Sequence, residues 1–261
     1  MRAADSSLLL DAIEFRVHLY AAAVGLSVLG SVGGLLAASS FLLLGDSIRV
    51  KALPWAISYA VGTLLGVALL ALLPQALESL PSTAALGTLL AGVLAFFLLE
   101  KLVLWRHCHD TLECEVHTSS AASLVIVGDA FHTFVDGAVI AAAVLTSIPL
   151  GVTTALAVAT HEIPQEVGDV AILLRAGFSR GRALTLNLLS GVGGILGAVG
   201  MLATSQSLPN LLPYVLAFAA GNFLYVAMSD LIPDLHRGGL EGGPLRQLLL
   251  IGAGILSIVA L

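Results

Sequence analysis

The chain has 261 residues, of which 58% are hydrophobic and only 11% are charged. A water-soluble domain carries about 25% charged residues, so this composition, with a mean hydropathy of +1.01, excludes an ordinary soluble protein. The formal charge of −6 does not indicate a charged partner, because the placement of charges in a membrane protein matters more than their sum. We expect lipid around the chain and no nucleic-acid partner.

Apolar stretches fill nearly the whole sequence. A bilayer core about 30 Å thick needs roughly 20 apolar residues for each helical crossing, and prolines, glycines and charged residues divide the chain into eight such stretches. We number them spans 1 to 8: 17–45, 52–77, 82–106, 119–146, 150–176, 181–204, 210–235 and 243–261. The sequence predicts an all-α, polytopic membrane protein with eight transmembrane helices, in which residues 1–261 form one transporter domain. Seven spans remain possible if the last stretch does not cross.

Basic residues orient these spans. With the N-terminus outside, nine of the 11 lysines and arginines fall on the inner side: Arg49, Lys51, Lys101, Arg106, Arg175, Arg180, Arg182, Arg237 and Arg246. Because cytoplasmic loops carry an excess of Lys and Arg, we expect both termini outside, in the cell membrane (a bacterial inner membrane or a plasma membrane). Spans 1–3 then run opposite to spans 6–8, which is the polarity of an inverted repeat around spans 4 and 5. No convincing sequence similarity between the halves supports this repeat, so it rests on polarity alone.

The inner loop before span 4, residues 107–118, is rich in potential metal ligands. It contains three histidines, two cysteines and three acidic residues within the eleven positions 107–117. The spacing fits no closed structural zinc site. A cytoplasmic site that receives or senses metal and a polar loop with incidental ligands remain equally open interpretations.

Span 4 carries ionisable residues in its middle, where they are costly and usually functional. Asp129, His132 and Asp136 are spaced i, i+3 and i+7, so they share one helix face, and Thr133 flanks it. Interhelical hydrogen bonding is the alternative reading for any one of these residues. That reading does not suit the whole set of seven ionisable groups, which are the three named here and four on the neighbouring span 5.

Span 5 has a matching polar face. His161 and Gln165 are an i, i+4 pair, and Glu162, Glu166 and Asp169 form an adjacent stripe. A short turn joins spans 4 and 5, so they should be antiparallel neighbours whose polar faces meet near the bilayer midplane.

Imidazole and carboxylate together suit Zn²⁺, Fe²⁺ and similar ions. His132, Asp136, His161 and Gln165 would supply one four-ligand site. Glu162 would supply the first ligand of a second metal site, with Asp136 bridging the two metals. We assign Asp129, Thr133, Glu166 and Asp169 to the surroundings of these ligands or to the ion pathway.

These two segments resemble a known family. Residues 128–137, GDAFHTFVDG, are similar to the fourth-span signature of ZIP (Zrt- and Irt-like protein) metal transporters. Residues 161–169, HEIPQEVGD, resemble its fifth-span signature, His-Glu-x-Pro-His-Glu. The resemblance extends to span 2, the end of span 3 and span 7, so it covers most of the chain.

The resemblance implies eight spans, a midplane metal site, movement of metal into the cytoplasm, a frequent homodimer and a rocking or elevator-like exchange of helix groups. It places a first metal on His132, Asp136, His161 and Gln165, and a second on Thr133, Asp136, Glu162 and Gln165. Relatives commonly have Asn in place of Thr133 and His in place of Gln165. Both changes weaken ligands, which puts the second metal and the ion preference in question.

We therefore predict a transporter of divalent cations, zinc first, that is not an enzyme and has no resident cofactor. The sequence does not separate Zn²⁺ from Fe²⁺, Mn²⁺ or Cd²⁺. An intramembrane zinc-dependent hydrolase is the alternative, because His161-Glu162 begins a helix like the His-Glu-x-x-His helix of metalloproteases. The second histidine is missing, however, and Pro164 interrupts the motif. A metal sensor without ion flux is a third interpretation.

Overall fold

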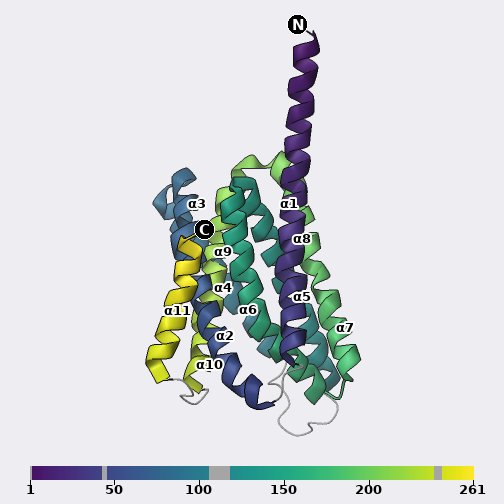
Figure 1. Cartoon of the computed structure of the whole chain (residues 1–261), viewed down its shortest axis with the longest axis vertical. Helices are drawn as coiled ribbons and strands as arrows, with labels where there is room; N and C mark the ends of the chain where they lie inside the picture. The colour runs from purple at the N-terminus through teal and green to yellow at the C-terminus, as the bar shows by residue number, and fades with distance from the viewer. Residues whose placement is uncertain (1, 43–45, 106–117, 238–242) are drawn as a thin grey trace.

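The computed structural model describes residues 2–42, 46–105, 118–237 and 243–261, and every element in these ranges is helical. In chain order the helices are α1 (Arg2–Leu42), α2 (Asp46–Gly66), the π-helix η1 (Val67–Leu72), α3 (Leu73–Ser79), α4 (Ser82–Trp105), α5 (Thr118–Thr146), α6 (Ile148–Arg175), α7 (Arg180–Ser190), α8 (Val192–Ser207), the 3₁₀-helix η2 (Pro209–Leu211), α9 (Leu212–Tyr225), the π-helix η3 (Val226–Leu231), α10 (Ile232–Arg237) and α11 (Gly243–Val259). They form an elongated bundle beyond which the N-terminal part of α1 projects (Figure 1).

Six helical stretches in the described part of the chain are long and apolar enough to cross a membrane: Glu14–Ser40, Lys51–Ser79, Ser82–Lys101, Ile126–Thr146, Arg180–Ser207 and Leu212–His236. They confirm an all-α, polytopic membrane protein. The predicted fifth span, α6, is not among them because its polar side chains lower its hydropathy. The predicted eighth span, α11, has only 17 residues. The count of eight spans therefore stays a prediction.

A single residue, Ser147, joins α5 and α6, where the sequence predicts a short turn. Ser147 caps α6, since its side chain accepts a hydrogen bond from the Leu150 amide at 3.3 Å. Pro149 lies in the first turn, where its missing N–H is tolerated. The helix then continues through Pro164 to Arg175. This tight connection makes α5 and α6 antiparallel neighbours.

Glycines allow α5 and α8 to pack backbone against backbone. A Cβ atom at Gly197 would collide with the Phe134 carbonyl, and one at Gly137 would collide with the Gly194 carbonyl. Small residues are what close helix packing requires in a membrane. Helix α8 therefore supports the helix that carries Asp129, His132 and Asp136.

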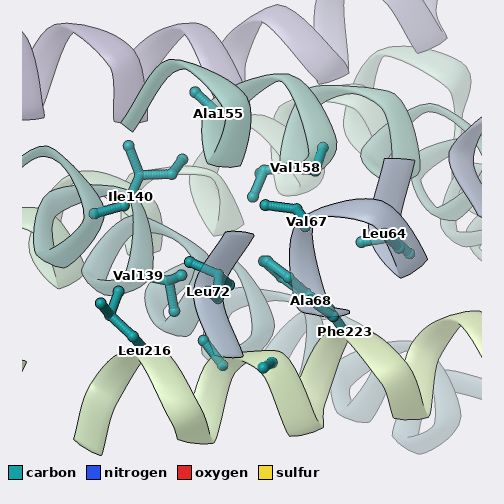
Figure 2. Packing of buried hydrophobic residues seen from close by; sticks show 14 of the residues in the cluster. Leu64, Val67, Ala68, Leu72, Val139, Ile140, Ala155, Val158, Leu216 and Phe223 are labelled. Carbon is teal, nitrogen blue, oxygen red and sulfur yellow. The ribbon is translucent and has the colours of Figure 1, made fainter. Parts of the chain in front are cut away.

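Apolar side chains fill the space between α6, α5, α9 and the segment α2–η1. Figure 2 shows the labelled members of this cluster: Leu64, Val67, Ala68, Leu72, Val139, Ile140, Ala155, Val158, Leu216 and Phe223. In α5 these residues follow Asp136, and in α6 they precede His161. The polar faces of both helices thus lie at one edge of a tightly packed apolar region.

Two other pairs of helices also pack backbone against backbone at a glycine, as α5 and α8 do. Gly254 in α11 lies so close to α2 that a Cβ atom there would collide with the Tyr59 carbonyl and the Thr63 amide. Gly92 in α4 approaches α9 in the same way, at the Phe218 carbonyl and the Asn222 amide. These two residues lie 159 positions after Tyr59 and Thr63. Helix α2 therefore packs on α11 much as α9 packs on α4.

The two π-helices occupy the same place in this pattern. Residues 60–77 and 219–236, aligned without a gap, each contain a π-helix followed by an apolar residue and a proline. Seven positions are identical: Ala60/Ala219, Gly62/Gly221, Leu65/Leu224, Val67/Val226, Ala68/Ala227, Leu72/Leu231 and Pro74/Pro233. Residues 60–77 of span 2 and 219–236 of span 7 are therefore alike in sequence and in the position of their π-helices.

We predict that Gly197→Ala destabilises the protein while Gly200→Ala, three residues later in the same helix, does not. The first substitution forces α8 away from α5, at an overpacking cost of about 1–3 kcal/mol. The second meets open space. Thermal unfolding followed by size-exclusion chromatography measures both, and equal melting temperatures would contradict the close packing.

Candidate metal centre

Four side chains from α5 and α6 converge on one point. The ligand atoms of His132, Asp136, His161 and Glu162 all lie within 4.8 Å of one another. The Nε2 atoms of the two histidines are 3.1 Å apart, and the Asp136 Oδ2 atom is 3.3 Å from each. The exposed fractions of these four residues are 7%, 0%, 1% and 0%. The predicted meeting of the two polar faces therefore occurs deep inside the bundle.

Neighbouring groups hold both imidazole rings in place. The Nδ1 atom of His161 lies 3.0 Å from the Ala157 carbonyl, one turn earlier in α6. A proton on Nδ1 donated to that carbonyl leaves the Nε2 lone pair directed at the centre, as in metal sites. Phe96 packs edge-on against His132 with ring centroids 5.7 Å apart, and Phe223 packs against His161 at 5.9 Å. The two rings are thus positioned by helices outside the α5–α6 pair.

The acidic members of this group lack ordinary partners. The Oδ2 atom of Asp136 lies 3.3 Å from each imidazole Nε2 atom, and Asp136 also lies beside Glu162. Among the described residues, no other donor reaches the carboxylate oxygens of Asp136 or Glu162, and no lysine or arginine pairs with them. Buried charges in proteins are paired or coordinate metals. The donor set of two imidazoles and two carboxylates fits a first-row divalent cation.

A second set of polar groups adjoins the first and involves α7. The Ser190 hydroxyl donates to Asp129, and the Gln165 amide nitrogen lies 3.4 Å from the other Asp129 oxygen. The Asn187 amide donates to Glu166 at 2.5 Å. Asn187 and Ser190 lie one turn apart on α7, and both are buried. They connect α7 to the polar faces of α5 and α6.

The other residues that the sequence assigned to the site have varied positions and partners in the structure. The Gln165 amide nitrogen lies 3.4 Å from Asp129, and the ligand role of Gln165 stays a prediction. Glu162 lies beside the two histidines. Thr133 donates its hydroxyl to the Asp129 carbonyl at 2.6 Å, a bond within its own helix. Asp169 lies further along α6, in the wall of a cavity. Of the predicted loop 107–118, only Thr118 falls within the described residues.

The site opens into a cavity of about 640 Å³, which along α5 and α6 lies on the side opposite the apolar residues 139–144 and 155–158. Ile57, Val226 and Leu231 of the apolar cluster also line it. His132, His161 and Asp129 lie in its wall at one end, and Leu53, Ile172 and Asp234 lie in its wall near the ends of their helices. These residues belong to the start of α2, the end of α6 and α10, which lie together at the end of the bundle opposite the projecting part of α1 (Figure 1). The metal centre is therefore connected to one end of the bundle.

Sequence reasoning missed the role of Asn187 and the contacts of Phe96 and Phe223. Asn187 and Ser190 have i, i+3 spacing in a mostly apolar segment, and this pattern indicates a polar helix face. The two phenylalanines carry no such signal, since aromatic residues are ordinary in apolar helices.

Comparison with known proteins identifies the family. The ZIP zinc transporter family matches residues 106–261. The chain belongs to the ZIP family. Zinc transporter ZIP13 of Pongo abelii is 37% identical over 237 residues, which cover 84% of this chain and 70% of that protein. ZIP13 of Homo sapiens is 32% identical over 274 residues, covering 84% and 74%. The zinc transporter foi of Drosophila melanogaster is 40% identical over 146 residues, covering 55% and 20%.

The relatives are named transporters rather than enzymes, so the hydrolase interpretation has no support. ZIP membership also confirms the resemblance drawn from residues 128–137 and 161–169. The assignment of individual ligands is not tested by these comparisons and stays a prediction.

We predict that His132→Ala and Asp136→Asn each weaken zinc binding to the purified protein by at least about tenfold, because each removes a ligand or an acid that contacts both imidazoles. His18→Ala is the matched control. His18 also lies near an acid, 3.7 Å from Glu14, but both side chains are exposed. Calorimetric titration measures the affinities, and an equal loss in the control would contradict the assignment.

Proposed function

We propose that the chain carries divalent cations, zinc first, across a membrane and toward the cytoplasm through the centre between α5 and α6. Its relatives are named zinc transporters, and its own buried donors suit zinc. The observation that carries the proposal is the position of His132, Asp136, His161 and Glu162. They lie between an apolar cluster on one side and a cavity on the other, which is the arrangement of a site reached from one side at a time.

Transport then requires the site to exchange access between the two sides. The helices divide into two groups by their packing: α1, α5, α6 and α8 pack on one another, as do α2 with α11 and α4 with α9. We propose that the first group carries the ion and moves against the second. The glycine contacts support this division, because they lie within each group. Contacts such as that of Phe223 with His161 lie between the groups and would be exchanged during the movement.

Eight spans and an inverted repeat belong to the same proposal. The polar residues of α6 face the centre of the bundle, so low hydropathy does not prevent this helix from crossing. At 1.5 Å per residue, α11 is about 25 Å long, close to the thickness of a bilayer core. The matched π-helices and the matched contacts of Gly92 and Gly254 support a two-fold relation between spans 1–3 and 6–8.

Orientation follows from charge. Lys51, Arg180 and Arg246 flank the starts of α2, α7 and α11, and these starts lie together at the end of the bundle where the cavity opens (Figure 1). The positive-inside rule makes this the cytoplasmic end, in a cell membrane, with both termini outside. The cavity then leads ions into the cytoplasm. Transport of Fe²⁺, Mn²⁺ or Cd²⁺ and assembly as a homodimer remain predictions from the family resemblance.

Uptake of radioactive zinc into proteoliposomes tests the function. We expect His132→Ala and Asp136→Ala to abolish uptake without loss of expression, because the ion then loses the ligands that replace its water. Glu162→Gln should also abolish uptake, and the same preparation should not hydrolyse peptides. If the two single variants His132→Ala and Asp136→Ala both take up zinc as well as the wild type does, this centre has no part in transport.

Accessibility of the cavity tests its direction. In a background with Cys108→Ser and Cys114→Ser, we expect Gly168→Cys to react with a membrane-impermeant thiol reagent from the cytoplasmic side, because Gly168 lines the cavity and is exposed. Ala141→Cys, which is fully buried in the apolar cluster, is the control and should stay unreacted. Reaction of Gly168→Cys only from the outer side would reverse the proposed orientation.

A further inference from the structure

Two positive side chains meet where α2 and α11 begin, at the end of the bundle where the cavity opens (Figure 1). The Arg246 guanidinium of α11 stacks over the Trp55 ring of α2, with 4.7 Å between its central carbon and the ring centroid. Lys51 precedes Trp55 by four residues in α2, so these two side chains share one helix face. All three residues are exposed. We call them the α2–α11 seam, and it places two cations beside one indole ring.

No acidic residue balances the charge of this seam. Among the described residues, the ion pairs involve only histidines, and neither Lys51 nor Arg246 contacts a carboxylate. The first turn of α11 contains no acidic residue either, so the N–H groups at this helix start add positive partial charge near Arg246. A guanidinium that stacks on a ring keeps its N–H donors in its own plane, where they can bind an anion. The seam therefore suits an anionic group.

Apolar side chains adjoin the two cations and narrow the choice of partner. Leu245 and Leu249, on either side of Arg246 in α11, are 68% and 65% exposed. Trp55 is 43% exposed, and tryptophan is enriched where the membrane meets water. The partner must therefore combine an anionic group with apolar chains at the depth of the membrane surface. An anionic phospholipid does so, and basic pockets between transmembrane helices on the cytoplasmic side bind such headgroups.

The internal repeat supplies a comparison within the same molecule. Tyr214 lies 159 positions after Trp55, near the start of α9 at the opposite end of the bundle, and is 42% exposed. Asn210 and Ala84 stand at the positions that correspond to the two cations, by this offset and by the matched glycine contacts of α4 and α11. An exposed aromatic residue is thus common to both ends, whereas the cations accompany only one of them. The positive-inside rule calls for cations at that end, but it does not require two of them at one seam.

We propose that Lys51, Trp55 and Arg246 bind the headgroup of one anionic phospholipid, whose acyl chains lie along the exposed leucines of α11. In the orientation proposed above, this lipid belongs to the cytoplasmic leaflet. The site lies on α2 and α11, outside the group of helices that is proposed to carry the ion. Its lipid holds the starts of these two helices together, and its binding does not depend on the metal centre.

Native mass spectrometry of the full chain, released from nanodiscs that contain equal amounts of phosphatidylglycerol and phosphatidylcholine, tests the proposal. We expect the wild type to retain one phosphatidylglycerol molecule in preference to phosphatidylcholine. Lys51→Gln/Arg246→Gln should bind phosphatidylglycerol about tenfold more weakly, since each cation at the membrane surface contributes to the binding of an anionic lipid. Lys51→Arg keeps the charge and should keep the wild-type affinity.

Lys101→Gln/Arg182→Gln is the matched control. Lys101 and Arg182 are exposed, and each also lies over an aromatic ring, that of Phe97 at 5.8 Å and that of Phe178 at 4.7 Å. They belong to α4 and α7, however, and not to the seam. The control loses the same net charge, so it should retain phosphatidylglycerol as the wild type does. An equal loss of lipid from the control would show attraction by net charge alone and would overturn the site.

Thermal unfolding in detergent gives a second readout. Added phosphatidylglycerol should raise the melting temperature of the wild type and of the control, because a ligand that binds only the folded state stabilises it. The same addition should leave the melting temperature of Lys51→Gln/Arg246→Gln unchanged. Without lipid the three proteins should melt alike and bind zinc alike, which shows that the substitutions at these exposed positions leave the fold and the metal centre intact.

Three results would overturn the lipid site. The first is equal retention of phosphatidylglycerol and phosphatidylcholine by the wild type. The second is wild-type retention of phosphatidylglycerol by Lys51→Gln/Arg246→Gln. The third is a wild-type dimer that this double variant separates into monomers, since a second copy of the chain would then cover the seam. None of these results affects the proposed function, because no residue of the seam belongs to the metal centre.

Discussion

The structure depends on the electrostatic cost of placing acidic side chains inside a membrane protein. Asp136 and Glu162 are completely buried, and among the described residues no lysine or arginine pairs with either carboxylate. Charged groups in such a place are stable only with a counter-charge. In the proposed function the counter-charge is the transported ion itself, so its binding would supply an interaction that the empty protein lacks. The same deficit would favour cations at the junction of α5 and α6.

The rest of the bundle separates this centre from water on one side only. The apolar cluster around Leu72, Val139 and Leu216 closes one half of the molecule, while the cavity leaves the other half open. Glycine contacts let the backbones of α5 and α8 touch, which places α7 beside the acids of α5 and α6. Polar groups on α7 then satisfy Asp129 and Glu166. Packing and electrostatics therefore cooperate, because close helix contact brings neutral donors to charged residues that would otherwise lack them.

Much of this arrangement could be predicted from local spacing. The i, i+3 and i+7 positions of Asp129, His132 and Asp136 and the short turn to α6 were sufficient to place the two polar faces together. The contacts made by other helices were less predictable. Asn187 and Ser190 of α7 bond to Glu166 and Asp129, and Phe96 and Phe223 pack against the two histidines. Spacing within α5 and α6 does not report which helices pack against them, and the ligand roles of Glu162 and Gln165 stay predictions.

The contact between Gly62 in α2 and Gly254 in α11 has a consequence for biosynthesis. The ribosome delivers α2 early, whereas α11 is the last of the described helices in chain order. The tightly fitting face of α2 therefore waits in the membrane, without its native partner, while the intervening helices are inserted. Assembly cannot finish helix by helix as the chain emerges, since an early helix is completed only by a late one. A nascent chain stopped before α11 would expose that glycine face to lipid.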